Sequence, residues 1–109
     1  MRIRYKVWIE KEGETLLSYG KYLILKEVEK TGSIRKAAQN LKIPYKKAHS
    51  YIKLTEERFG KKLFIRKKGM GTVLTDEGKK LLQTYERILE KFEGTLKELE
   101  EGFKKPEDD

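Results

Sequence analysis

Hydrophobic and polar residues alternate at the start of the chain. The odd positions from Ile3 to Ile9 carry apolar or aromatic side chains, whereas most of the even positions are charged. A period of two with β-branched and aromatic residues is typical of a strand. We therefore predict a strand over residues 2–10, then a turn at residues 12–14 and a short partner strand over residues 15–18.

After this predicted hairpin the spacing of hydrophobic residues changes to three and four, which is typical of helices. A first helix is predicted over residues 22–30, because Gly32 can take the left-handed conformation that ends a helix. Ser33 is a good N-cap for a second helix of about two turns. A third helix is predicted from Pro44 to Phe59, since proline is tolerated in a first helical turn.

The third predicted helix is amphipathic, and its outer side is basic. Its inner face consists mostly of apolar residues: Ala48, Tyr51, Ile52, Thr55 and Phe59. Its outer face carries hydrogen-bonding and cationic side chains: Tyr45, Lys46, His49, Ser50 and Lys53. Such a helix can bury one side in a small core and present the other side to an anionic partner.

A basic hairpin is predicted after the third helix. Residues 63–66 and 72–74 are strand-like, and the turn between them contains two lysines and two glycines. Thr75 is then suited to cap a last helix, because it is followed by two acidic residues that favour the positive end of the helix dipole.

The last predicted helix carries an apolar stripe that steps by fours and threes from Leu81 to Phe103. This pattern suits pairing with another helix, although Gly94 weakens the middle by roughly 1 kcal/mol. Packing on its own domain is the alternative, but about 25 residues span about 38 Å, more than a small domain covers. We therefore predict a homodimer interface on the stripe: Leu81, Tyr85, Ile88, Leu89, Phe92, Leu96 and Leu99.

The basic excess lies in the first two thirds of the chain. The formal net charge of the 109 residues is +8, and residues 1–74 hold 19 Lys and Arg against 7 Asp and Glu. Such an excess favours an anionic partner, either nucleic acid or a membrane surface. No apolar run approaches the ~20 residues of a membrane span, and no signal-peptide pattern occurs, so we expect a cytoplasmic protein without membrane contact.

Several classes of chemistry have no support in the sequence. The chain contains no cysteine and one histidine, His49. We find no paired carboxylates, nucleotide-binding loop or metal-ligand spacing. We therefore expect no enzymatic activity, no catalytic residue, no metal and no cofactor.

Five segments in this order resemble a known group of proteins. They are Tyr5–Glu10, Thr31–Ala38, Pro44–Ala48, Glu56–Gly60 and Leu74–Gly78. Together they resemble the N-terminal DNA-binding domain of molybdate-dependent ModE regulators, a relative of the LysR-type domain. The resemblance covers roughly residues 3–92.

The resemblance implies an α+β fold, mainly α: a winged helix-turn-helix with an N-terminal strand or hairpin and a long C-terminal dimerisation helix. It implies a homodimer that binds double-stranded DNA, with recognition helices in successive major grooves. Accordingly we divide the chain into a DNA-binding domain over residues 1–74, a dimerisation helix over 75–103 and a disordered acidic tail over 104–109.

The predicted DNA contacts come from the start of the second helix, the outer face of the third and the wing: Ser33, Arg35, Lys36, Pro44, Tyr45, Lys46, Lys47, His49, Ser50, Lys53, Arg66, Lys67 and Lys68. Lysines are expected to neutralise phosphates. Base reading is assigned to Tyr45, His49 and Ser50. The alternative for each residue is an ordinary solvated surface position.

Three functions fit these observations. The first is a sequence-specific transcriptional regulator that binds DNA as a homodimer. The second is an architectural DNA-binding or RNA-binding protein that does not read sequence. The third is a subunit that dimerises through its long helix and obtains its signal from a separate effector-sensing partner, because the oxyanion-binding domains of full-length ModE regulators have no counterpart in these residues.

Overall fold

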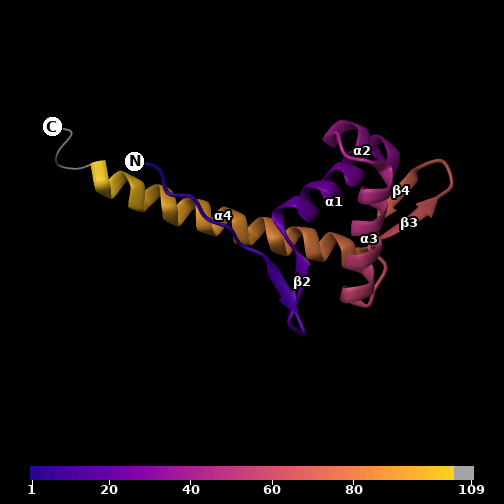
Figure 1. Cartoon of the computed structure of the whole chain (residues 1–109), viewed down its shortest axis with the longest axis horizontal. Coiled ribbons are helices and arrows are strands. Elements are labelled where there is room, and N and C mark those ends of the chain that lie inside the picture. Colours follow the sequence, from indigo (N-terminus) through magenta and orange to yellow (C-terminus); the bar gives the residue numbers. More distant parts are fainter. Residues whose placement is uncertain (105–109) are drawn as a thin grey trace.

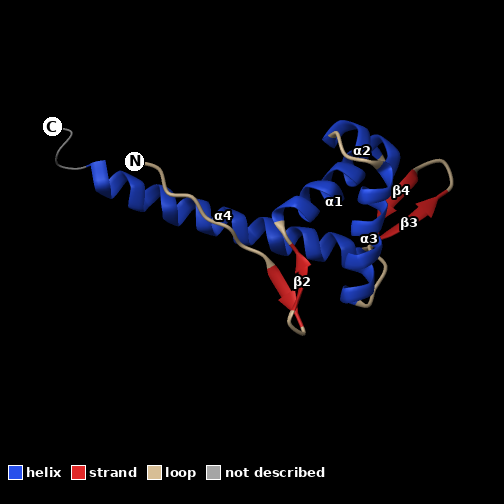
Figure 2. Ribbon diagram, viewed as in Figure 1, coloured by secondary structure: helices blue, strands red, loops and turns tan. Residues whose placement is uncertain are grey.

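Three helices and two β-hairpins are arranged around the first half of a long fourth helix (Figures 1 and 2). The computed structural model describes residues 1–104. The elements in chain order are β1 (Ile9–Lys11), β2 (Glu14–Leu17), α1 (Tyr19–Thr31), α2 (Ile34–Leu41), α3 (Tyr45–Phe59), β3 (Phe64–Lys67), β4 (Gly71–Leu74) and α4 (Asp76–Lys104). The predicted winged helix-turn-helix order is confirmed. The tail predicted over residues 104–109 lies outside the described residues, apart from Lys104, where α4 ends.

The first helices begin and end at residues with clear capping roles. The Ser18 hydroxyl accepts a hydrogen bond from the backbone N–H of Lys21 at the start of α1, and the Ser33 hydroxyl accepts one from Lys36 at the start of α2. Gly32 ends α1 with a φ of 71°, in the left-handed region that glycine enters without a steric penalty. Gly32 and Ser33 together set the short connection between α1 and α2.

The core lies where α1, α2 and α3 meet the first turns of α4. The largest fully buried side chains are Leu17, Leu25, Val28, Thr55, Leu63, Leu82 and Tyr85. Ala37, Ala38 and Ala48 are also buried, and their small side chains let α2 and α3 approach closely. The buried hydroxyl of Thr55 donates to the carbonyl of Tyr51 at 2.8 Å. Its burial therefore leaves no polar group without a hydrogen-bond partner.

The predicted N-terminal strand is mostly wrong. Only Ile9–Lys11 forms a strand, while residues 1–8 run beside α4 without belonging to a sheet (Figure 1). The predicted alternation is nevertheless present in the burial of these side chains, because Ile3, Tyr5 and Val7 are half-buried and their neighbours are exposed. The side chains of a helix can cover every second side chain of an extended segment, but the helix backbone has no free groups to form the hydrogen bonds of a sheet. The alternating burial therefore occurs here without a sheet.

The β3–β4 hairpin, which we call the wing, is antiparallel and is bonded to the helix-turn-helix close to its tip. Its strands pair from Phe64 with Leu74 to Lys67 with Gly71. The backbone N–H of Thr72 donates to the carbonyl of Gly32 at 3.0 Å, which ties β4 to the turn before α2. The wing and the helix-turn-helix are therefore joined through their backbones.

Helix α4 changes environment along its length. Leu81 and Tyr85, two of the predicted interface residues, are buried in the protomer's own core and are unavailable to a partner in this conformation. Phe92, Leu99 and Phe103 are exposed by 47%, 53% and 59%. The second half of α4 projects away from the other helices and accounts for the 60 Å long axis of the molecule (Figure 1). The exposed part of the stripe therefore begins beyond Tyr85.

Candidate nucleic-acid interface

Helices α2 and α3 and the wing lie at one end of the molecule, opposite the projecting end of α4 (Figure 1). Eleven of the thirteen predicted DNA contacts have exposed side chains at this end: Arg35, Lys36, Pro44, Tyr45, Lys46, Lys47, Ser50, Lys53, Arg66, Lys67 and Lys68. Ser33 and His49 are half-buried. The fold therefore brings three separate segments of the sequence into one cationic region, which we call the basic end.

Helix α3 is held with its polar side outward. Ala48, Ile52 and Thr55 are buried, whereas Lys46, Ser50 and Lys53 on the other side are exposed. The carbonyl of Pro44 accepts hydrogen bonds from the N–H groups of Lys47 and Ala48. The predicted inner and outer faces of this helix are confirmed.

The start of α2 combines a structural role with an exposed cationic side chain. Ser33 acts first as the N-cap, with its hydroxyl oxygen 3.1 Å from the N–H of Lys36. The backbone N–H groups in the first turn of a helix favour anions, and Lys36 adds a full positive charge there. This turn is suited to a phosphate, as predicted for Ser33.

An aromatic and cationic stack joins α2 to α3. The guanidinium carbon of Arg35 lies 4.5 Å from the centre of the Tyr45 ring. The Tyr45 and His49 rings are stacked, with centroids 5.8 Å apart and an interplanar angle of 24°. No spacing along the chain indicates that Arg35 and Tyr45 meet, because their contact depends on how the two helices cross.

The wing presents charge at its tip and an apolar side chain beside it. Arg66, Lys67 and Lys68 are exposed on β3 and the turn. Met70 is 65% exposed and Ile65 is 43% exposed, and neither was among the predicted contacts. The wing thus offers phosphate-neutralising groups, with apolar surface next to them.

A second polar cluster lies away from the basic end and joins α1 to α4. The Tyr22 hydroxyl donates to the Glu86 carboxylate at 2.7 Å, and Lys26 lies 3.1 Å from the same oxygen. The hydrogen bond from Tyr22, aided by Lys26, lowers the pKa of Glu86. Burial, together with the hydrogen bond to Glu86, raises the pKa of Tyr22 to about 12. This cluster stabilises the attachment of α4.

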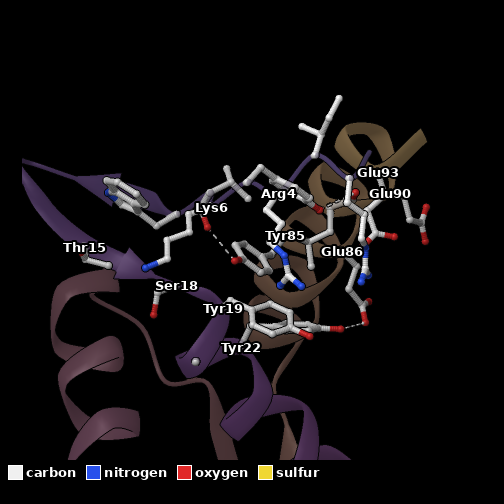
Figure 3. A pocket seen from close by; sticks show the side chains of 17 residues that line it. Arg4, Lys6, Thr15, Ser18, Tyr19, Tyr22, Tyr85, Glu86, Glu90 and Glu93 are labelled. Carbon is white, nitrogen blue, oxygen red and sulfur yellow. Dashed lines mark hydrogen bonds between the residues drawn. The ribbon is translucent and has the colours of Figure 1, made fainter. Parts of the chain in front are cut away.

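A broad groove lies beside this cluster. It is about 1490 Å³ in volume and runs between the N-terminal segment, the start of α1 and α4 (Figure 3). Its lining mixes aromatic, basic and acidic side chains, among them Arg4, Tyr19, Tyr85 and Glu93. It opens along the part of α4 where the exposed apolar stripe begins.

In residues 1–104, no group of three or more His, Asp or Glu side chains is placed to hold a metal ion. None of the helices in the same residues combines the length and the apolar character that a membrane crossing requires.

Comparison with known proteins identifies the helix-turn-helix. The sequence profile of the bacterial regulatory helix-turn-helix proteins of the lysR family matches residues 21–79, more than half of the chain. The transcriptional regulator ModE of Haemophilus influenzae is 38% identical over 69 residues. That match takes in 60% of this chain but only 27% of the ModE relative, so the chain spans a minor part of that protein.

Solved structures have the same fold. The crystal structure of CbnR, a LysR family transcriptional regulator, superposes with a TM-score of 0.61 at 23% identity, over 72% of this chain and 27% of CbnR. A complex of the CbnR DNA-binding domain with DNA superposes with a TM-score of 0.64 at 21% identity, over 79% of this chain and 98% of that domain. At these identities the likeness establishes the fold alone.

Proposed function

The chain belongs to the lysR family of bacterial regulatory helix-turn-helix proteins, and we propose that it regulates transcription as a homodimer whose two α3 helices enter the major groove of duplex DNA. Members of this family carry a DNA-binding regulatory domain, and the family is not an enzyme family. The homodimer, the groove contacts and action in the cytoplasm are our proposals.

The basic end carries the proposal. Exposed cationic or hydrogen-bonding side chains from α2, α3 and the wing lie together there, although they come from three parts of the sequence. Helix α3 is suited to the major groove, because its inner face is buried in the core and its outer face exposes polar and cationic side chains. The wing lysines are suited to the flanking phosphates, because Thr72, close to the tip of the wing, is bonded to the turn before α2.

The projecting half of α4 supports the homodimer. Phe92, Leu99 and Phe103 are about half exposed in the protomer, which is unusual for a contiguous apolar stripe on a soluble chain. A second copy of α4 would cover these side chains, and the adjacent groove offers it a concave seat. We therefore keep Ile88, Leu89, Phe92, Leu96 and Leu99 as the proposed interface, and leave out the buried Leu81 and Tyr85.

Regulation requires a signal, and its source is a further proposal. The ModE relative extends well beyond the segment that matches this chain. We propose that the effector is sensed by a separate partner, which acts on the dimer through α4 or the N-terminal segment.

The test measures how tightly the whole chain binds different nucleic acids over a range of salt concentrations. Dissociation constants are measured for genomic duplex fragments, random duplexes and RNA of matched length. The proposal predicts that some genomic duplexes bind more tightly than random ones, and that duplex DNA competes better than RNA. Tighter binding of RNA, or indistinguishable affinities for all duplexes, would favour an architectural or RNA-binding protein and overturn the proposal.

Wing variants provide a matched control in the same experiment. The double variant Lys67→Ala/Lys68→Ala is expected to reduce the slope of log K against log salt by about 0.9 for each lost phosphate contact. Lys97→Ala removes an exposed lysine from the projecting half of α4 and is expected to leave the slope unchanged. Equal effects of these variants would remove the wing from the interface.

A further inference from the structure

We propose that Arg35 reads a guanine in the major groove and that Tyr45 holds its guanidinium in place. This inference rests on the proposed function and makes it more specific, because it names the base that the protein recognises. It also changes the sequence-based assignment, in which Tyr45, His49 and Ser50 were the base-reading residues and Arg35 had no such role.

The contact between the two residues is set by the fold. Arg35 lies in the first turn of α2 and Tyr45 in the first turn of α3, with the guanidinium carbon 4.5 Å from the ring centre. The crossing of these helices is fixed by buried Ala38 and Ala48. Both side chains of the pair are exposed, so the pair lies on the outer surface of the two packed helices. A docked duplex would meet the guanidinium in a preset position.

The stack leaves the hydrogen-bonding edge of Arg35 free. In residues 1–104, the Arg35 side chain takes part in neither a hydrogen bond nor an ion pair, and its guanidinium lies over the face of Tyr45. A guanidinium stacked on a ring keeps its N–H donors at its edge, in the fork that matches the O6 and N7 acceptors of guanine. Adenine offers a donor where guanine has O6, so the same fork discriminates between these bases.

The ring lowers the cost of using this fork. A free arginine side chain loses much rotamer freedom when it makes two hydrogen bonds, and contact with a ring before binding removes part of that loss. The Tyr45 ring is itself stacked with half-buried His49, which restricts its motion. Tyr45 and His49 are therefore positioning residues, and the nearby Lys36 and Lys46 serve phosphates without distinguishing bases.

In the test, bound duplexes are selected from a random pool, separately with the wild-type chain and with each of four variants. The variants are Arg35→Lys, Tyr45→Phe, Tyr45→Ala and Lys46→Ala. For the wild type we expect one guanine in each half-site to be strongly enriched. Arg35→Lys keeps the charge but loses the fork, so the preference for that guanine should fall roughly 5- to 150-fold, the range for one bidentate contact. Affinity for random DNA should stay close to the wild-type value.

The two Tyr45 variants distinguish the effect of the ring from the effect of the hydroxyl. The Lys46 variant distinguishes base recognition from the general effect of positive charge. Tyr45→Phe keeps the ring and is expected to keep the guanine preference, whereas Tyr45→Ala should weaken it. Lys46→Ala should weaken binding to all duplexes equally and leave the preference intact. Thermal unfolding checks that each variant is folded, and all three positions are exposed, so folding is expected to survive.

The inference is overturned if Arg35→Lys retains the guanine preference, or if Tyr45→Ala retains it. Both results leave the proposed function standing, since the wild-type pool is still enriched. A wild-type pool that stays random overturns the proposed function together with this inference, so the two failures can be told apart.

Discussion

The hydroxyl of Tyr85 donates a hydrogen bond of 2.8 Å to the backbone carbonyl of Val7, a residue 78 positions earlier in the chain. Tyr85 is fully buried, and its ring also packs against Tyr22 with a centroid separation of 5.2 Å. Farther along α4, the N–H of Ile3 donates to the Glu100 carboxylate at 2.7 Å. The N-terminal segment is thus attached to α4 by a few side-chain contacts and not by a sheet.

Tyr85→Phe removes the hydroxyl and keeps the ring. We expect a loss of about 1 kcal/mol in the free energy of unfolding, because the Val7 carbonyl loses its partner. Hydrogen exchange should also become faster over residues 1–8 and stay unchanged in α3, and urea unfolding with exchange mass spectrometry measures both. Unchanged exchange in residues 1–8 would mean that this hydrogen bond does not hold the segment.

Gly78 and Gly94 both lie in α4, but an alanine should have opposite effects at the two positions. A Cβ at Gly78 would lie 2.5 Å from the Leu63 carbonyl oxygen, whereas at Gly94 it would meet open space. We expect Gly78→Ala to destabilise by about 1–3 kcal/mol through overpacking. Gly94→Ala should stabilise by roughly 0.5–1 kcal/mol, because alanine is the better helix former. Urea unfolding of both variants at one protein concentration tests this, and equal effects would contradict the packing of α4 against Leu63, the residue before β3.

The Tyr22–Glu86 pair predicts a particular dependence of stability on pH. The folded-state pKa of Glu86 lies below its ordinary value of 4.5, so its contribution is present above that pH and is lost as the pH falls through the lower folded value. The stability difference between the wild type and Glu86→Gln should therefore shrink below about pH 4.5. Denaturant midpoints of both proteins from pH 3 to 7 measure it, and a constant difference would exclude this linkage.

Tyr22 provides the alkaline counterpart. Because its pKa rises from 10.0 to about 12 on folding, the stability that it supplies is present below pH 10 and is lost as the pH approaches 12. Tyr22→Phe cannot ionise and should remove that part of the alkaline decline. The same midpoints at pH 9 to 12 give the answer, and parallel curves for the two proteins would argue against it.

Leu99→Lys tests the proposed dimer without touching the core, since Leu99 is 53% exposed in the protomer. Placing a charge in an apolar interface leaves it desolvated, so we expect the dissociation constant of the dimer to rise at least about tenfold. The unfolding of the isolated protomer should change little. Sedimentation equilibrium measures the association, with Lys97→Ala as the control. A wild-type chain that is monomeric at tens of micromolar would contradict the dimer itself.

Local signals predicted the helix-turn-helix well. Ser33 and Gly32 mark the boundary between α1 and α2, and the apolar spacing of α3 identifies its buried side, because capping and periodicity act over a few residues. The exposed basic end followed from the same patterns. Its residues come from segments that the motif brings together in any chain of this fold.

Longer-range relationships were not predictable in this way. The alternation at Ile3 to Ile9 indicates one buried side, but it does not say whether a sheet or a helix buries it. The stripe on α4 gave no sign of where the protomer's own core ends, so Leu81 and Tyr85 were assigned to the interface. The contact of Arg35 with Tyr45 depends on a helix crossing, which no spacing along the chain encodes.

The basic end is proposed to bind duplex DNA in a sequence-dependent way. The most direct measurement is the ratio of dissociation constants for a duplex enriched from a random pool and for a shuffled duplex of the same composition, at one physiological salt concentration. We predict a ratio of about 10³ or more in favour of the enriched duplex, as for specific DNA-binding proteins. A ratio near one would contradict the claim, because binding would then depend on phosphates alone.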